Sequence, residues 1–210
     1  MKKRLLRIWF CFIQFLTIPA NFCYSRATNL QVVRPPSFTI ENGTLIVANH
    51  QSKWDPFLIS YHIGISNWFT IVPLRYPVTP DYMLTGWLRF FITIFGGYSI
   101  GHTPLQKLKG LALTRELLRE QYSVVLFPEG KISYTTDETD VFQRGVEMLF
   151  SYNYPVVFVR LSKLNSPDKF YFWQKNRPTI EYSNFLGSDI PAETKIKKMM
   201  EFYNLTYHQK

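Results

Sequence analysis

Short apolar runs bounded by turn residues alternate with longer segments of helical periodicity along most of the chain. Residues 45–48, 124–127 and 155–159 are continuous apolar runs, partly β-branched, and the turn pair Asn42-Gly43 precedes the first of them. Runs of this length and composition are typical of buried strands. Residues 67–72, 170–173 and 179–182 are also predicted to be strands.

Helices are predicted between these strands. Asp55-Pro56 suits a helix start, because Asp is a good N-cap and Pro is tolerated at the first helical position. Thr103, followed three residues later by Gln106, resembles a capping box. The expected helices cover residues 56–63, 83–95, 103–121, 142–152 and 191–203. This order of elements predicts one α/β domain in which a central mixed sheet is flanked by helices.

Two of these helices have unusual faces. Residues 83–95 are apolar almost all round, so this helix is expected to be buried or to face lipid. Trp87, Phe90, Phe91 and Phe95 could line an apolar tunnel or dip into a membrane beside the amino-terminal segment, but packing in the core is the favoured interpretation. In the last helix, the exposed lysines at 195, 197 and 198 either touch a membrane surface or are solvated.

The amino terminus is basic at residues 2–4 and mostly apolar from 5 to 24. A secretory signal peptide begins in the same way, but no clear small-x-small cleavage site follows. The uninterrupted apolar part, residues 8–18, is shorter than the ~20 residues of a spanning helix and contains Gln14. We therefore expect a retained helix that lies in one leaflet, with Arg7 and the basic residues before it on cytoplasmic phosphates; a single span is the alternative.

The domain division follows from this segment. Residues 1–33 are predicted to be the membrane anchor helix and linker, and residues 34–210 the folded domain. The two cysteines, Cys11 and Cys23, both fall in the anchor, so no disulfide framework is expected.

Composition agrees with a protein that works at a membrane surface. The 210 residues suffice for one domain with its own core, and the net charge of +9 favours anionic partners. Zinc-ligand spacing, RNA-binding aromatic motifs and a helix-turn-helix pattern are missing, so a membrane surface is favoured over nucleic acid. Aromatic residues make up 17% of the chain, which suits a headgroup interface.

Candidate chemistry begins in the turn after the first predicted strand, at Asn49-His50-Gln51-Ser52-Lys53-Trp54-Asp55. His50 lies between a strand and a helix, where α/β proteins place ligands. The chain can fold Asp55 back so that its carboxylate orients the imidazole, which leaves the other ring nitrogen free to accept a proton. The alternative is that His50 is a turn residue and Asp55 only a helix cap.

A second motif, Phe127-Pro128-Glu129-Gly130, follows another predicted strand, with Glu129 79 residues after His50. Together, Asn-His-x-Ser-x-x-Asp and Phe-Pro-Glu-Gly in this order resemble the glycerolipid acyltransferases, which include 1-acylglycerol-3-phosphate acyltransferases and the tafazzin transacylases. The resemblance covers residues 44–159. It implies that Glu129 and Gly130 hold the glycerol of the acceptor, and that Lys131 keeps a positive charge near its phosphate.

Three further basic residues are candidates for substrate binding. Arg75 is similar in placement to a family lysine, and Arg144 lies in a segment that resembles Phe-Lys-x-Gly. The family's second motif usually ends in an arginine that binds the acceptor phosphate, but here that position is His102. Either His102 takes this role, or Arg75 or Lys131 supplies it, or the acceptor is not a phosphate monoester.

The resemblance implies acyl transfer from acyl-CoA or acyl carrier protein to a lysophospholipid, by default 1-acyl-sn-glycerol-3-phosphate, in phospholipid biosynthesis. His50 would be the general base and Asp55 its partner, and no metal or organic cofactor is expected. The expected place is the cytoplasmic face of the membrane. A tafazzin-like transacylase and a catalytically inactive lipid-binding protein are the alternatives.

Overall fold

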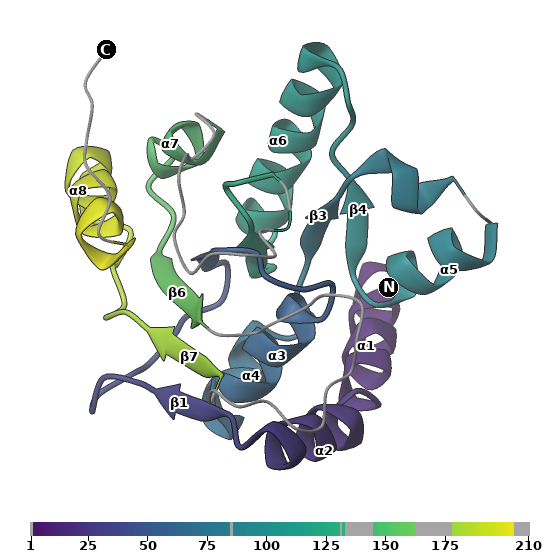
Figure 1. Ribbon diagram of the computed structural model, residues 1–210. Coiled ribbons are helices and arrows are strands. Elements are labelled where there is room, and N and C mark those ends of the chain that lie inside the picture. The colour runs from purple at the N-terminus through teal and green to yellow at the C-terminus, as the bar shows by residue number, and fades with distance from the viewer. Residues whose placement is uncertain (1, 85, 131, 133–144, 163–177, 204–210) are drawn as a thin grey trace.

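A five-stranded mixed sheet forms the centre of the computed structural model, which describes residues 2–84, 86–130, 132, 145–162 and 178–203 (Figure 1). The strand order is β1-β7-β6-β2-β5. β2 is parallel to both of its neighbours, whereas β6 and β7 are antiparallel. The strands are β1 (Gln31–Val33), β2 (Leu45–Ala48), β5 (Val124–Leu126), β6 (Val156–Ser162) and β7 (Thr179–Tyr182).

A second, two-stranded parallel sheet continues beyond β5. It consists of β3 (Tyr76–Val78) and β4 (Gly97–Ser99). Arg75, directly before β3, forms a parallel bridge with Val124 of β5. The carboxyl ends of β2, β3, β4 and β5 therefore point to the same edge of the molecule, which we call the carboxyl edge.

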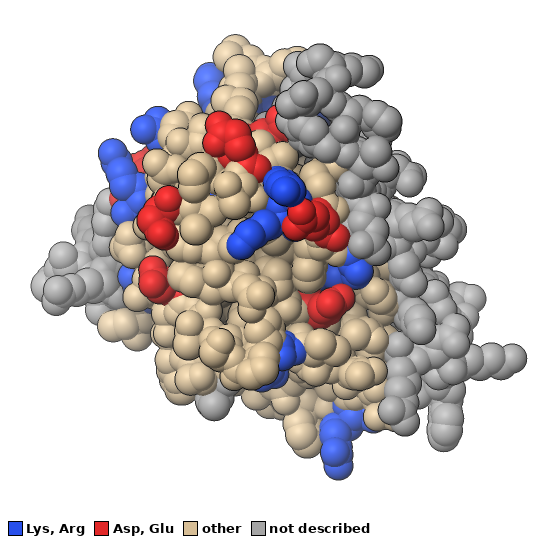
Figure 2. Space-filling model, turned by 90° about the vertical axis from the view of Figure 1, so that its left-hand side faces the viewer, with Lys and Arg blue, Asp and Glu red and all other residues tan. Residues whose placement is uncertain are grey.

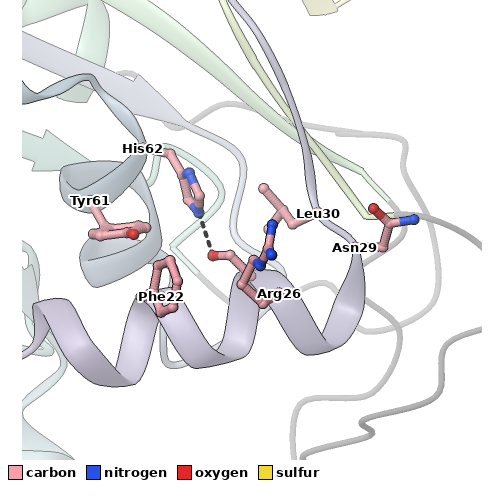
Figure 3. Close-up of a pocket in the computed structure, with 7 residues that line it drawn as sticks. Phe22, Arg26, Asn29, Leu30, Tyr61 and His62 are labelled. Carbon is pink, nitrogen blue, oxygen red and sulfur yellow. Dashed lines mark hydrogen bonds between the residues drawn. The ribbon is translucent and has the colours of Figure 1, made fainter.

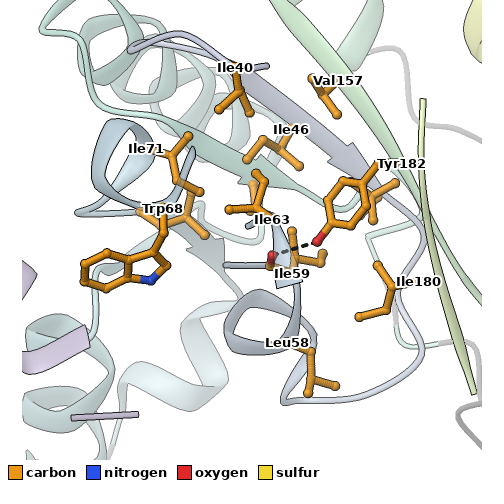
Figure 4. Close-up of a cluster of buried hydrophobic side chains, with 14 of the residues drawn as sticks. Ile40, Ile46, Leu58, Ile59, Ile63, Trp68, Ile71, Val157, Ile180 and Tyr182 are labelled. Atoms are coloured by element: carbon orange, nitrogen blue, oxygen red, sulfur yellow. Dashed lines mark hydrogen bonds between the residues drawn. The ribbon is translucent and has the colours of Figure 1, made fainter. Parts of the chain in front are cut away.

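Helices cover both faces of the sheet, because β2 turns alternate side chains to opposite faces. Ile46 and Ala48 pack with α3 (Asp55–His62) and α4 (Ile65–Ile71) in one core cluster (Figure 4). Leu45 and Val47 pack with the helices of the other face: α6 (Pro104–Arg119), α7 (Gly145–Phe150) and α8 (Ala192–Tyr203). Burial on both faces explains why the central strands are continuous apolar runs.

The predicted α/β architecture is confirmed, and one predicted strand is wrong. Residues 67–72 lie mostly in helix α4. Trp68 is 6% exposed and Phe69 is 69% exposed, while Ile71 and Val72 are buried, which is helical periodicity. The aromatic and β-branched composition suggested a strand, but packing of this face against the core overrides local propensity. The strand predicted at 170–173 lies outside the described residues.

Two burial predictions are also wrong. Helix α5 (Gly86–Ile94) has no buried residue, and Trp87, Phe90 and Phe91 are exposed, so core packing is wrong for these three. Phe95, directly after the helix, is half-buried and packs edge-to-face on Phe57. In α8, Lys195 reaches neither solvent nor a membrane, since it is fully buried and its Nζ donates a hydrogen bond to the Tyr154 carbonyl at 2.9 Å. Lys197 is exposed as expected and forms an ion pair with Glu201.

The amino-terminal segment forms two helices, α1 (Lys2–Phe15) and α2 (Ile18–Thr28), that contact the domain. Phe10, Ile13 and Gln14 are buried. Gln14 Nε2 donates to the carbonyls of Leu74 (2.8 Å) and Phe95 (2.9 Å), and its Oε1 accepts from the Leu74 amide at 2.9 Å. The polar residue that interrupts the apolar segment thus ties α1 to the domain.

The opposite face of this segment is apolar and exposed, with side chains of Ile8, Trp9, Phe12, Phe15, Leu16 and Phe22. Within the described residues, one helical stretch, Arg7–Thr28, is long and apolar enough to cross a membrane by length and composition alone. It lies near the amino terminus, where signal sequences share these properties.

Candidate active site

The site begins where β2 ends at the carboxyl edge. Asn49 follows the strand, and its buried side chain pairs with both backbone groups of Leu161 in β6. Its Oδ1 accepts from the Leu161 amide at 2.6 Å, and its Nδ2 donates to the Leu161 carbonyl at 2.8 Å. These two bonds hold the start of the turn against β6, so His50 leaves the sheet in a defined direction.

Asp55 is the first residue of α3, and its carboxylate points back into the turn rather than out to solvent. Its Oδ2 accepts from His50 Nδ1 at 2.8 Å, from the Gln51 amide at 2.7 Å and from the Ser52 amide at 2.8 Å. Ser52 Oγ donates to Oδ1 at 2.6 Å. Asp55 is fully buried, so these donors and the positive end of α3 replace water around the carboxylate.

This arrangement gives the two nitrogens of His50 different roles. The bond to Asp55 holds the proton on Nδ1, so Nε2 carries the free lone pair. The side chain is 18% exposed, which leaves the ring accessible from one direction. The contact predicted from the sequence is therefore present, and it can act as a general base if a hydroxyl reaches Nε2.

The second motif meets the first because β2 and β5 are parallel neighbours. Phe127 stacks on the imidazole of His50, with ring centroids 4.0 Å apart and planes at 19°. Glu129 is buried, and its Oε1 accepts from the His50 backbone amide at 3.3 Å. Gly130 has φ +66°, which a residue with a Cβ adopts only with strain, and its amide donates to the Phe127 carbonyl.

His102 lies on the same carboxyl edge, in the loop after β4. Its Nε2 is 3.2 Å from Asp81 Oδ1, and both side chains are exposed. Asp81 belongs to the short helix η1 (Pro80–Met83), which follows β3. Lys53, in the His50 turn, has its Nζ 5.7 Å from the ring centroid of Tyr82, beside Asp81. Lys53 therefore reaches this edge from the loop after β2, and His102 from the loop after β4.

Arg75 is not brought to His50. It is level with the start of β2, since both Arg75 and Leu45 pair with Val124, and β2 carries the chain about 10 Å further before the His50 turn. Its guanidinium lies 4.8 Å from the Phe10 ring centroid, and burial lowers its pKa. Its Nε has no hydrogen-bond partner among the described residues.

Two other candidates from the sequence, Lys131 and Arg144, lie outside the described residues. Sequence reasoning missed the roles of Asn49 and Phe127, although both stand in the motifs. Their contacts with Leu161 and His50 join residues far apart in the chain, which no local pattern reveals. No three His, Cys, Asp or Glu side chains in the described part of the chain gather closely enough to hold a metal ion.

A pocket of about 300 Å³ lies between α2 and α3, at the opposite end of α3 from Asp55 (Figure 3). His62 Nε2 and Ser25 Oγ are 2.6 Å apart in it, and Ser25 also donates to the Asn21 carbonyl. Burial, with a smaller contribution from Arg34, lowers the pKa of His62 to about 4. The imidazole is therefore neutral at physiological pH and joins α2 to α3.

The chain matches one protein-family pattern and one solved structure in particular. The sequence pattern of the family described as Acyltransferase matches residues 24–161. The chain is also similar to the crystal structure of the 1-acyl-sn-glycerophosphate (LPA) acyltransferase, PlsC, from Thermotoga maritima, with a TM-score of 0.57 and 16% identity over 97% of this chain and 94% of that chain. At this identity the likeness concerns the fold. No curated protein matches the chain.

Proposed function

Because the chain belongs to the Acyltransferase family, we propose that it transfers a fatty acyl chain from an acyl thioester to the free hydroxyl of a lysophospholipid. The observation that carries this proposal is the pair of His50 and the buried Asp55, with Nε2 free beside the Phe-Pro-Glu-Gly turn. Acyl-CoA or acyl carrier protein is the donor.

The proposed reaction uses His50 twice. Its Nε2 takes the proton of the acceptor hydroxyl while the oxygen attacks the thioester carbonyl, and the carboxylate of Asp55 stabilises the imidazolium that forms. The tetrahedral intermediate then collapses, the carbon–sulfur bond breaks, and the imidazolium returns its proton to the leaving thiolate. The products are a new ester and a free thiol. This sequence needs neither a metal nor an organic cofactor.

The acceptor is proposed to bind along the carboxyl edge. Glu129 can accept hydrogen bonds from a glycerol hydroxyl, and the turn at Gly130 brings backbone close to the ligand. His102 is proposed to bind the acceptor phosphate, together with Lys131 and Arg144. Arg75 is not proposed for this role, because it lies at the opposite end of the sheet from His50. The Thermotoga maritima protein is described as acting on LPA, which supports 1-acyl-sn-glycerol-3-phosphate as the first acceptor to test.

The amino-terminal helices are proposed to attach the enzyme to the cytoplasmic face of a membrane. Their outer face is apolar, and the basic residues 2–4 precede it in the sequence. Since Gln14 binds α1 to the domain, we infer that α1 lies in one leaflet rather than crossing the bilayer. Attachment there keeps the enzyme beside lipids that cannot leave the membrane.

One rival function has a specific observation in its favour. The Lys131 that follows Phe-Pro-Glu-Gly is more similar to tafazzin-like members, which move acyl chains between phospholipids. Such a transacylase would work without any thioester. A third possibility is a lipid-binding protein without activity. The argument for it is that His102 stands where the family usually has the arginine that binds the acceptor phosphate.

The test is acyl transfer by the purified protein in detergent micelles, with labelled acyl-CoA and acyl carrier protein against a panel of lysophospholipids. We expect transfer that His50→Ala abolishes. His102→Arg should lower the KM for acceptors with a phosphate monoester and leave other acceptors unchanged. Transfer between phospholipids without a thioester would favour the rival, and no transfer by folded protein in either assay would refute both enzymatic readings.

A further inference from the structure

Helix α5 is an apolar helix whose outer face is not covered by the described residues. Its sequence from Gly86 to Ile94 contains one charged residue, Arg89, and no residue of the helix is buried. Trp87 is 70% exposed and Phe90 is 59% exposed, and Leu84, just before the helix, is 78% exposed. A soluble surface rarely gathers so many large apolar side chains, so this face is expected to contact something apolar.

The aromatic rings of α5 contact one another instead of the core. Trp87 and Phe91 have ring centroids 6.2 Å apart, and Phe90 and Phe91 5.7 Å apart, both in edge-to-face geometry. These ring contacts lie within the helix itself and leave its outer face exposed. Tryptophan and phenylalanine at this density are typical of segments that sit at the boundary between headgroups and acyl chains.

The position of α5 joins two regions already described. It lies between η1, which follows β3 at the carboxyl edge, and β4, which begins at the opposite edge. Its far end is tied to α1, because Gln14 Nε2 donates to the carbonyl of Phe95, directly after the helix. Figure 1 shows α5 beside α1 on one side of the molecule. The exposed apolar faces of α1 and α5 thus belong to one connected unit.

Charge on this unit favours lipid over a second protein surface. Arg89 is exposed, and α5 contains no acidic residue. Asp81, the acidic residue of the preceding η1, faces His102. By contrast, acidic and basic side chains are mixed on the face that carries α8 (Figure 2). An aromatic helix with one cation matches the apolar interior and anionic headgroups of a leaflet.

We propose that α5 is a second membrane-inserting element, which enters the same leaflet as α1 and fixes the tilt of the domain so that the carboxyl edge opens onto the lipid. The occupant of this face is a phospholipid leaflet. The proposal rests on the proposed function in that it takes the substrate to be a membrane lipid. One inserted helix leaves the domain free to rotate about it, whereas two joined helices define a plane.

The first test is the depth of α5 in vesicles of phosphatidylcholine and phosphatidylglycerol. The described cysteines are free, so a full-length Cys11→Ser/Cys23→Ser background accepts a single environment-sensitive dye at Trp87→Cys. A control label at Lys197→Cys lies on α8, on the other side of the molecule (Figure 1). We expect the α5 label to shift to the blue and to be quenched by lipids that carry a quencher on the acyl chain, and the α8 label to do neither.

The second test is affinity for the same vesicles. Trp87→Ser and Phe90→Ser should each weaken binding about tenfold, from the apolar area lost. Met148→Ser, which removes an exposed apolar side chain from α7, should change it by less than about twofold. A water-like α5 label on vesicle-bound protein would overturn the proposal, as would a blue shift without lipid that grows with protein concentration, since that outcome assigns the face to a second copy.

These results are independent of the reaction. Acyl transfer in detergent with a water-like α5 label on vesicles would leave the proposed function standing and refute the insertion. An inserted α5 label in protein that transfers no acyl chain in either assay would refute the proposed function alone.

Discussion

The carboxylate of Asp55 offers a sharp test of the proposed base. In Asp55→Asn the amide oxygen can take the place of Oδ2 and still accept from His50 Nδ1, Gln51 and Ser52. The amide nitrogen then faces Ser52 Oγ, which can accept as well as donate. The substitution therefore keeps the geometry of the turn and removes only the negative charge.

The magnitude follows from the ion pair. Two unit charges about 4 Å apart interact with about 4 kcal/mol at an effective dielectric constant of 20. The amide retains a neutral hydrogen bond worth about 1 kcal/mol, so the imidazolium formed in the transition state loses about 3 kcal/mol. This loss corresponds to a decrease in kcat of about 100-fold. Ser52→Ala removes one hydrogen bond to the carboxylate and leaves its charge, so kcat should fall by less than about tenfold.

The assay is the initial rate of acyl transfer in mixed micelles, with kcat and KM measured separately and folding checked by circular dichroism. A double variant separates the roles, because Asp55 acts through His50: Asp55→Asn should add almost nothing to the loss caused by His50→Gln. If folded Asp55→Asn keeps kcat within about threefold of the parent, or if the two losses multiply, the assignment of Asp55 as the partner of a histidine base is wrong.

The remaining predictions concern the frame of the site. Gln14→Leu leaves the backbone groups of Leu74 and Phe95 without their hydrogen-bond partner, so the free energy of unfolding in detergent should fall by about 2 to 4 kcal/mol. The control Gln31→Leu, at an exposed position, should lower it by less than about 0.5 kcal/mol. Equal decreases would contradict the role of Gln14 in holding α1 to the domain. Folding lowers the pKa of His62 from 6.5 to about 4, so the unfolded chain takes up the proton first as pH falls. The contribution of His62 to stability is therefore full above about pH 6.5 and decreases toward pH 4. The slope of this decrease is at most about 1.4 kcal/mol per pH unit. His62→Gln should flatten this decrease in a titration of unfolding free energy, and an unchanged slope would count against it. Gly130→Ala, which places a Cβ at φ +66°, should destabilise the turn by about 1 to 2 kcal/mol and raise the KM for the acceptor more than it lowers kcat; unchanged kinetics would exclude Gly130 from the site.

Local chemistry in the His50 turn could be predicted because its partners are close in sequence. Asp55 lies five positions after His50, and a strand followed by a helix start leaves the carboxylate few directions to take. The same reasoning could not find the bond between Asn49 and Leu161, which are 112 residues apart. The meeting of His50 with Glu129, by contrast, follows once both are placed after neighbouring parallel strands.

Burial was harder to predict than element type. The apolar helix 83–95 was expected, but composition does not tell whether such a helix lies in the core or faces lipid, and α5 has no buried residue. Lys195 shows the converse error. A lysine on a basic helix is normally solvated, yet its Nζ reaches the Tyr154 carbonyl and the stem fills the interior. The burial of α5 and of Lys195 depends on which other elements pack against them. The periodicity of one segment does not give this information.

Gln14 shows how one polar residue changes the meaning of an apolar segment. Its presence argued against a spanning helix on grounds of hydrophobicity, and the structure supplies a second reason, since the amide is occupied by backbone groups before β3 and after α5. In the proposed membrane-bound enzyme, a helix bound in this way presents only its outer face to lipid. The same amide also joins α1 to the end of α5, through the Phe95 carbonyl. If both helices enter a leaflet as proposed, the depth of the two is set together, and with it the distance a lipid hydroxyl must cover to reach His50.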